Sequence, residues 1–130
     1  MKIFIIGLAA AIFSLNLYAT DISFECPNSN AEIVALINAP NVYCGEAINI
    51  ATQCAFGSSR DLEIVSAAKA VCLKEAGNLS REDQNLLAMM ERRCNQAYEN
   101  QAGTMYMSMN AFCHLQAVDF IRNVQPEEAN

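Results

Sequence analysis

The residues best suited to chemistry lie together near the C-terminal end of the chain. Cys94 and Cys113 enclose the run Met-Tyr-Met-Ser-Met at positions 105–109, and the single histidine, His114, follows directly. Thioether sulfur suits soft Cu(I), a thiol beside a histidine suits nucleophilic catalysis, and two cysteines suit a disulfide. The stretch is therefore a copper site, a reactive thiol or a stapled helical hairpin.

Helical spacing separates these interpretations. Met105 and Met109 share one face of a helix, whereas Met107 points nearly opposite and His114 is five positions beyond Met109. Neighbouring residues of a helix point about 100 degrees apart, and a bridged Cys113 has no thiolate to offer. We expect the methionines to act mainly as packing, with two of the three in the core. A copper site made of Met105, Met109 and His114 is the alternative.

Other catalytic and metal-binding patterns are missing from the sequence. The closest cysteines, Cys44 and Cys54, are ten positions apart, which excludes a zinc motif and a Cys-x-x-Cys redox pair. The chain shows no Ser, His and Asp arrangement and no glycine-rich phosphate loop. The acidic pair Glu82 and Asp83 falls in a predicted first helical turn, where it complements the helix dipole. We expect no catalytic residue, no cofactor and no enzyme activity.

The N-terminus has the pattern of a secretory signal. Residues 1–19 contain a basic Lys2, an apolar stretch and a small residue, Ala19, at the expected cleavage point. The apolar stretch is shorter than the roughly 20 residues that span a bilayer, and no later segment qualifies. We predict a periplasmic or secreted protein whose mature chain has 111 of the 130 residues, the size of one domain.

The charge balance indicates which partners are suitable. Removal of the signal leaves seven Lys and Arg residues against 14 Asp and Glu residues, a formal charge of −7. This balance argues against nucleic acid, because phosphates require a basic surface. It suits a basic protein partner, and it equally suits solubility alone.

Apolar spacing and turn residues predict an all-α fold. Residues 20–42 form an N-terminal arm with a short helix that ends at Pro40, and residues 125–130 form a frayed tail. Residues 43–124 form a helical domain of four helices, because apolar side chains recur there at spacings of three and four. The last two helices have these predicted buried stripes: Leu86, Leu87, Met90, Cys94, Ala97 and Tyr98, then Tyr106, Met109, Cys113, Ala117, Phe120 and Val124.

Glycines and serines mark where these helices end and begin. Gly57, Gly77 and Gly103 are predicted stops. Two serines each precede an aspartate by three positions, Ser58 before Asp61 and Ser80 before Asp83, which is the spacing of a capping box. The predicted architecture is a small disulfide-stapled bundle built from two helical hairpins.

The six cysteines predict a disulfide framework, since an even number in a small exported domain is typical of one. Six cysteines allow 15 connectivities. Residues equally far from the turn of an antiparallel hairpin lie at equal height, and two pairs meet this condition: Cys94 with Cys113 about Gly103, and Cys44 with Cys72 about Ser58. Cys26 and Cys54 are then left to pair. The rival pair Cys54 with Cys72 centres inside a predicted helix and is disfavoured.

The last two predicted helices resemble the C-terminal half of the LprI-like lysozyme-inhibitor family of exported bacterial proteins. The segments LSREDQNLLAMMERRC and GTMYMSMNAFCHLQAVDFI carry the resemblance. The positions that match in order are Leu79, Gln84, Arg92 or Arg93, Cys94, Gly103, Thr104, Met105, Cys113 and Leu115. Cys44, Cys54 and the pair Asp61-Leu62 are similar to its first half, so the resemblance covers residues 44–122.

The resemblance implies a protein that binds and blocks a lysozyme outside the cytoplasm, with an acidic surface suited to a basic enzyme. It assigns no inhibitory residue in this chain. The expected function is therefore an exported small binding protein, with lysozyme inhibition as its most concrete form. The alternatives are a periplasmic interaction or immunity-type protein with another protein partner, and the copper-binding protein described above.

Overall fold

The computed structural model describes residues 24–124, which fold into five α-helices and contain no strand. The expected signal segment 1–19 and tail 125–130 lie outside the described residues. The expected disulfide-stabilised all-α fold is confirmed. The helices are α1 (Asn30–Ile37), α2 (Cys44–Gln53), α3 (Asp61–Ala76), α4 (Arg81–Tyr98) and α5 (Thr104–Val124).

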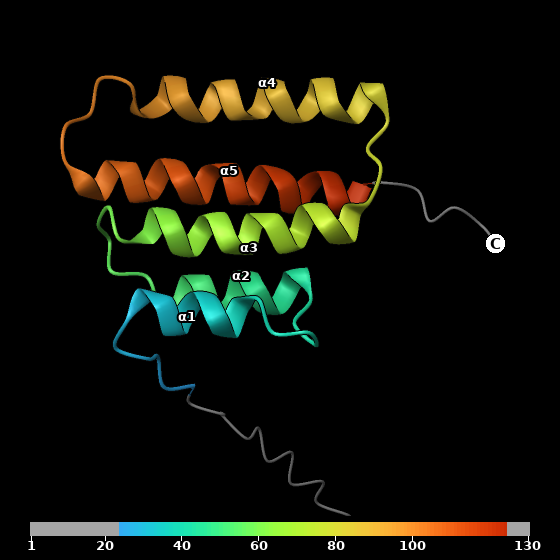
Figure 1. Cartoon of the computed structure of the whole chain (residues 1–130). Helices are drawn as coiled ribbons and strands as arrows, with labels where there is room; N and C mark the ends of the chain where they lie inside the picture. The colour runs from blue at the N-terminus through green and yellow to red at the C-terminus, as the bar shows by residue number, and fades with distance from the viewer. Residues whose placement is uncertain (1–23, 125–130) are drawn as a thin grey trace, which may run out of the picture.

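The helices are arranged as two hairpins joined through a central pair. Figure 1 shows α4, α5 and α3 running side by side, with α1 and α2 below α3. The first hairpin is α2 with α3, the second is α4 with α5, and the two hairpins meet where α3 packs on α5. α4 therefore lies at the outer edge and packs mainly on α5.

Two glycines and one serine define the helix ends as the sequence predicts. Gly77 caps the C-terminus of α3 with φ 69° and Gly103 precedes α5 with φ 114°, and both values lie in the region that favours glycine. Ser80 is the N-cap of α4, and its hydroxyl accepts a hydrogen bond of 3.1 Å from the Asp83 N–H. α1 ends at Ile37, three residues before Pro40.

The other predicted capping box has a different role. α3 begins at Asp61 with Arg60 as its N-cap residue, so Ser58 lies outside the helix. The Ser58 hydroxyl accepts from the Arg60 N–H (3.3 Å) instead of capping. The Asp61 carboxylate is fully buried and accepts from the N–H groups of Phe56 (2.8 Å), Gly57 (2.8 Å) and Ser58 (3.3 Å). It therefore organises the whole turn between α2 and α3.

Asp61 also connects this turn to α5. The Ser108 hydroxyl donates to Asp61 Oδ2 at 2.6 Å, and both side chains are buried. Burial acts to raise the pKa of the Asp61 carboxyl, but the hydrogen bonds from Phe56, Ser108, Ser58 and Gly57 outweigh burial and lower the pKa below its ordinary value. The carboxylate is thus held in its charged form inside the protein.

Three disulfides join all six cysteines. They connect Cys26 to Cys54, Cys44 to Cys72 and Cys94 to Cys113, with Cα–Cα distances of 5.5, 4.4 and 5.7 Å. Symmetry about the turns predicts the second and third of these pairs, and Cys26 with Cys54 is the pair that then remains. One bridge holds the N-terminal arm, one crosses the first hairpin and one crosses the second.

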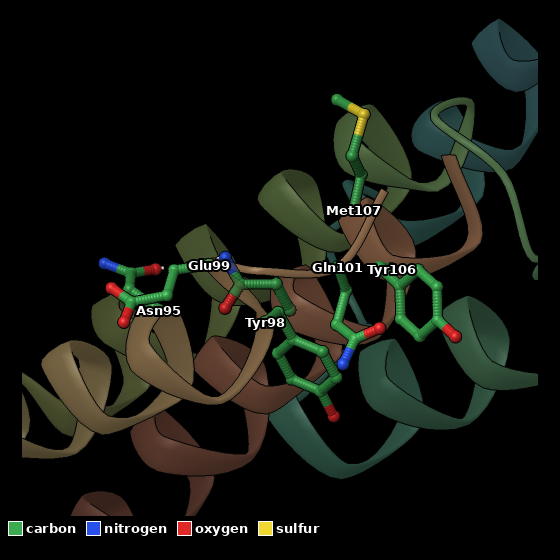
Figure 2. A pocket seen from close by; sticks show the side chains of 7 residues that line it. Asn95, Tyr98, Glu99, Gln101, Tyr106 and Met107 are labelled. Atoms are coloured by element: carbon green, nitrogen blue, oxygen red, sulfur yellow. Dashed lines mark hydrogen bonds between the residues drawn. The ribbon is translucent and has the colours of Figure 1, made fainter. Parts of the chain in front are cut away.

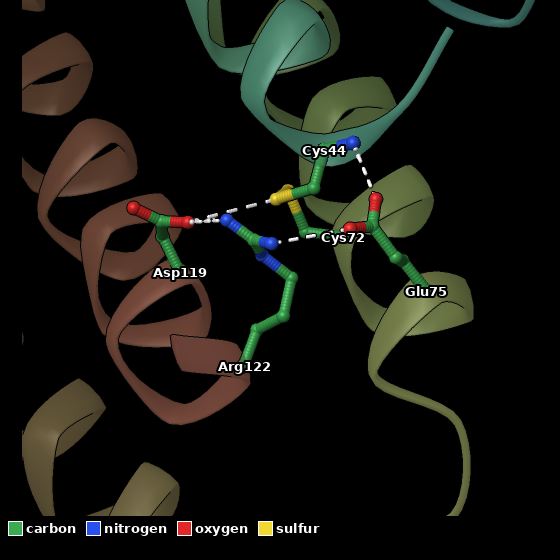
Figure 3. A network of polar contacts seen from close by, with 5 residues as sticks. All are labelled: Cys44, Cys72, Glu75, Asp119 and Arg122. Carbon is green, nitrogen blue, oxygen red and sulfur yellow. Dashed lines mark hydrogen bonds and ion pairs between the residues drawn. A yellow bond between two sulfur atoms is a disulfide. The ribbon is translucent and has the colours of Figure 1, made fainter. Parts of the chain in front are cut away.

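A polar network surrounds the bridge of the first hairpin. Figure 3 shows Glu75 between the N-terminus of α2 and the guanidinium of Arg122. Glu75 accepts from the Cys44 N–H (2.6 Å) and from Arg122 Nη1 (3.1 Å), and Arg122 Nη2 donates to Asp119 at 2.7 Å. The Glu75 side chain of α3 thereby caps the N-terminus of α2. Its ion pair with Arg122 connects α2 and α3 to the end of α5.

The core lies around α3, not around α4. The largest fully buried apolar side chains come from α1, α3 and α5: Ile33, Ile37, Ile64, Leu115, Val118 and Ile121. In α4 only Cys94 is buried, and its other apolar residues are half-buried or exposed. Among residues 24–124, no helix is both long and apolar enough to cross a membrane.

The predicted buried stripe of α5 is wrong at Met109, Phe120 and Val124, which are exposed, and confirmed at Ala117, which is buried. Leu115 and Val118, outside the predicted stripe, face the core. The expected packing role of the methionines is also wrong, because the exposed fractions are 50% for Met105, 47% for Met107 and 42% for Met109. α5 is apolar on several sides, so its sequence alone does not show which side meets α3.

Candidate functional site

A groove runs between α3 and α4, with α5 as its floor. Its volume is about 320 Å³. The wall from α3 contributes Leu62, Val65, Ser66 and Lys69, α4 contributes Asn95, and α5 contributes Met107, Asn110, Ala111 and His114.

A second hollow of about 300 Å³ lies at the turn of the α4–α5 hairpin. Its lining residues are Asn95, Tyr98, Glu99, Gln101, Tyr106, Met107 and Asn110. In the view of Figure 2, Gln101 lies between the rings of Tyr98 and Tyr106, and Met107 points away from them toward α3. Asn95, Met107 and Asn110 line both the hollow and the groove, so the two form one continuous surface. We call it the hairpin-end surface.

A polar network fixes the geometry of the groove. Lys69 of α3 forms an ion pair with Glu91 of α4, and His114 Nδ1 lies 3.4 Å from the same Glu91 oxygen. Asn95 Oδ1 is 2.8 Å from His114 Nε2 and accepts from Asn110 Nδ2 at 3.0 Å. The network joins α3, α4 and α5, so it sets the width of the groove.

The network explains what His114 does. Both of its ring nitrogens face partners, and the neighbouring Cys113 is bridged to Cys94, so this pair supplies no nucleophile. Within the described residues, no group of three His, Cys, Asp or Glu side chains could hold a metal ion. His114 therefore acts as a hydrogen-bonding member of the groove.

The three residues of the alternative copper site are not brought together. Nine positions separate Met105 from His114, which places them on opposite sides of α5, and His114 lines the groove while Met105 and Met109 do not. The methionine that shares the groove with His114 is Met107.

Positive and negative side chains do not balance on the hairpin-end surface. Lys69 is balanced by Glu91 in the groove. Glu99 is the single charged side chain that lines the hollow, and it has no ion pair with any residue between 24 and 124. The uncompensated charge of this surface is therefore negative, which favours a basic group on whatever binds there.

The sequence patterns did not mark Asn95 or Glu99, and they placed Tyr98 and Tyr106 in buried stripes instead of at a surface site. These four residues become neighbours only because the hairpin folds back at Gly103. The available signal was composition, since residues 95–110 are rich in Asn, Gln, Tyr and Met. Tyrosine and methionine are enriched at protein interfaces, so composition is the local feature that could have directed attention to this segment.

Comparison of the chain with known protein families, with curated proteins and with solved structures finds no match. The fold and the bridges define a small disulfide-stabilised all-α protein. Such bridges are typical of proteins in an oxidising compartment.

Proposed function

We propose that this protein is an exported binding protein that recognises a protein partner through the hairpin-end surface. The observation that carries the proposal is the combination of two half-buried tyrosines, Tyr98 and Tyr106, with the exposed Met107 around one hollow. Tyrosine supplies a large contact area at a small entropic cost, and methionine adapts to irregular partner surfaces. Such residues commonly dominate binding energy.

The surface is also preorganised. The Cys94–Cys113 bridge fixes the two arms of the hairpin, and the Lys69–Glu91 pair adds a link between α4 and α3. A surface that is already ordered loses less entropy on binding than a mobile one. The rigid frame therefore supports recognition by this end of the hairpin.

The most concrete partner is a basic lysozyme, which the protein would inhibit. The sequence resemblance across residues 44–122 supports this proposal, and so does the mature formal charge of −7. Glu99 in the hollow, which has no ion pair with the described residues 24–124, supplies a local negative charge for a basic residue of the enzyme. Attraction of this kind accelerates encounter and weakens as salt screens it.

A binding and lysis assay tests the proposal. The mature oxidised protein should bind a hen-type lysozyme at low salt, bind it less tightly as salt rises, and protect bacterial cell walls from lysis. Replacing both Tyr98 and Tyr106 by alanine should weaken binding at least about 100-fold, since buried interface tyrosines are worth about 2 kcal/mol or more each. Tyr43→Ala is the matched control, because Tyr43 is a largely exposed tyrosine that lines neither the groove nor the hollow.

The outcomes separate the partner from the surface. Absence of both complex and protection at low salt would rule out lysozyme. If lysozyme binds but the double tyrosine variant binds equally well, the hairpin-end surface is not the site. If envelope extracts instead yield another protein whose binding requires Tyr98 and Tyr106, the protein is a periplasmic interaction or immunity-type module.

A further inference from the structure

The α4–α5 hairpin has a second apolar face, on the side away from the groove. Four of its exposed large apolar side chains lie along α5 at Met105, Met109, Phe120 and Val124. At about 100 degrees per residue these four fall within roughly 100 degrees of the helix circumference. Met107, which lines the groove, is on the other side of the helix. We call this side of the hairpin the back face.

A shallow hollow of about 300 Å³ continues the back face toward α4. Its floor is the Cys94–Cys113 bridge, and its other lining residues are Met90, Arg93, Gln116 and Ala117. α4 is amphipathic, yet Cys94 is its single buried residue. An amphipathic helix gains most of its stability from tertiary packing of its apolar face. In this hairpin, part of the apolar surface of α4 and α5 is left without such packing.

The order of residues along the back face indicates what covers it. Met105 and Val124 are equally far from the midpoint between His114 and Leu115, and so are Met109 and Phe120. Cys113 and Gln116, which line the hollow, flank the same midpoint. If two copies of α5 pair antiparallel about a two-fold axis at this midpoint, Met105 meets Val124 of the other copy and Met109 meets Phe120 of the other copy. A pattern that is its own complement is the requirement for an isologous interface.

We propose that the back face joins two copies of this chain into a symmetric antiparallel dimer. The hairpin of each copy then supplies two helices to a four-helix arrangement, a stable way to bury amphipathic helices. The two grooves stay open, because each groove lies on the side of α5 opposite the back face. The dimer therefore presents two grooves, and it does not depend on the identity of the partner proposed above.

Electrostatics predict an unusual salt dependence for this dimer. Each mature copy carries a formal charge of −7, so the copies repel one another. Arg93 lies beside Cys94, level with the centre of the pattern, so the two Arg93 side chains also approach across the axis. Salt screens both repulsions, and association should tighten as salt rises. Binding of a basic partner should change in the opposite direction.

Sedimentation equilibrium of the mature oxidised protein tests the proposal. We expect concentration-dependent dimerisation that Met109→Asp weakens at least about tenfold in Kd. Met107→Asp is the matched control, because Met107 is the same residue type on the same helix with similar exposure but on the groove side. It should leave dimerisation unchanged. Circular dichroism would show that both variants are folded.

Paired substitutions test the antiparallel register. Met109→Glu combined with Phe120→Glu should abolish the dimer, whereas Met109→Lys combined with Phe120→Glu should retain it, because opposite charges then meet across the axis. A protein that stays monomeric up to about 1 mM would overturn the proposal. So would a dimer that Met109→Asp and Met107→Asp affect equally. Neither result depends on whether lysozyme binds, so failure of the dimer and failure of the proposed function are distinguishable.

Discussion

The two hairpins of this protein use a similar disulfide in opposite settings. In the α2–α3 hairpin, both Cys44 and Cys72 are completely buried among apolar side chains, and the polar network of Glu75 and Arg122 surrounds them. In the α4–α5 hairpin, the Cys94–Cys113 bridge forms the floor of an open hollow and α4 has no other buried residue. The Cys44–Cys72 bridge lies inside a packed core. The Cys94–Cys113 bridge holds together a hairpin that has little core of its own.

This difference separates the part of the molecule that supplies most of the core from the part that we propose for recognition. The α1–α3 region supplies most of the buried apolar side chains, and α5 completes it. The α4–α5 hairpin needs fewer buried contacts because its bridge holds it, which leaves tyrosine and methionine side chains available on its surface. Four sets of substitutions test this division between the two hairpins.

Removing the bridge of the first hairpin should have the largest effect. Cys44→Ala with Cys72→Ala frees a loop closed over a separation of 28 residues, which costs about 3 to 4 kcal/mol in the chain-entropy model. Loss of packing at two fully buried sites adds to this cost. Chemical denaturation should show a global loss of stability or an unfolded protein. A loss below about 1 kcal/mol would contradict the central role of this bridge.

Removing the bridge of the second hairpin should have a smaller and local effect. Cys94→Ala with Cys113→Ala frees a loop of 19 residues, worth about 3 kcal/mol in the same model. Because α4 packs mainly on α5, we expect amide hydrogen exchange to accelerate in α4 while α1, α2 and α3 keep their protection. Equal acceleration in all five helices would show that the hairpins are not separable.

Replacing the buried carboxylate of Asp61 should destabilise the junction between the hairpins. Asp61→Asn presents an amide N–H to backbone donors, so about 2 kcal/mol of stability should be lost. The lowered pKa of Asp61 means that its stabilisation is fully present above the unfolded pKa of about 3.9 and is lost as the pH falls through the lower folded pKa. Below about pH 5, the stability of Asp61→Asn should therefore depend less on pH than the stability of the unsubstituted protein does. Ser58→Ala is a suitable control, because the Asp61 bond uses the Ser58 backbone.

Replacing Lys69 should have the smallest effect on stability. Lys69→Met removes a partly exposed ion pair with Glu91, and such pairs are worth about 0.5 to 1 kcal/mol. A double-mutant cycle with Glu91→Gln measures this coupling directly. The informative result is the affinity for the partner. The free energy of binding should fall by more than the free energy of unfolding does, because the pair sets the width of the groove. Unchanged binding would show that the groove does not take part in recognition.

Much of the fold follows from local signals in the sequence. Gly77, Ser80 and Gly103 mark helix ends through backbone geometry and capping, which act within a few residues. The symmetry of cysteines about the turns depends only on helix rise, so it leads to the pairs that the structure contains.

The sites that sequence analysis missed depend on tertiary structure. Spacing suggested that Ser58 and Asp61 form a capping box. The role of Asp61 depends instead on Ser108, 47 residues beyond it, whose hydroxyl donates to the buried carboxylate and helps to lower its pKa. The buried stripe of α5 was misplaced because two of its sides are apolar, and only the position of α3 decides between them. The hollow of Tyr98 and Tyr106 likewise exists only in the folded hairpin.

The order of the bridges along the chain has a consequence for biogenesis. Cys26–Cys54 and Cys44–Cys72 interleave, because Cys44 lies inside the loop that the first bridge closes. A chain that crosses a membrane N-terminus first and oxidises each cysteine with the next one to emerge would join Cys26 to Cys44. Reaching the native pairs from that intermediate requires thiol–disulfide exchange, which takes seconds to hours depending on oxidant and isomerase. Maturation of the exported protein that we propose should therefore depend on a disulfide isomerase, whereas Cys94 and Cys113, consecutive cysteines in the chain, need only an oxidant.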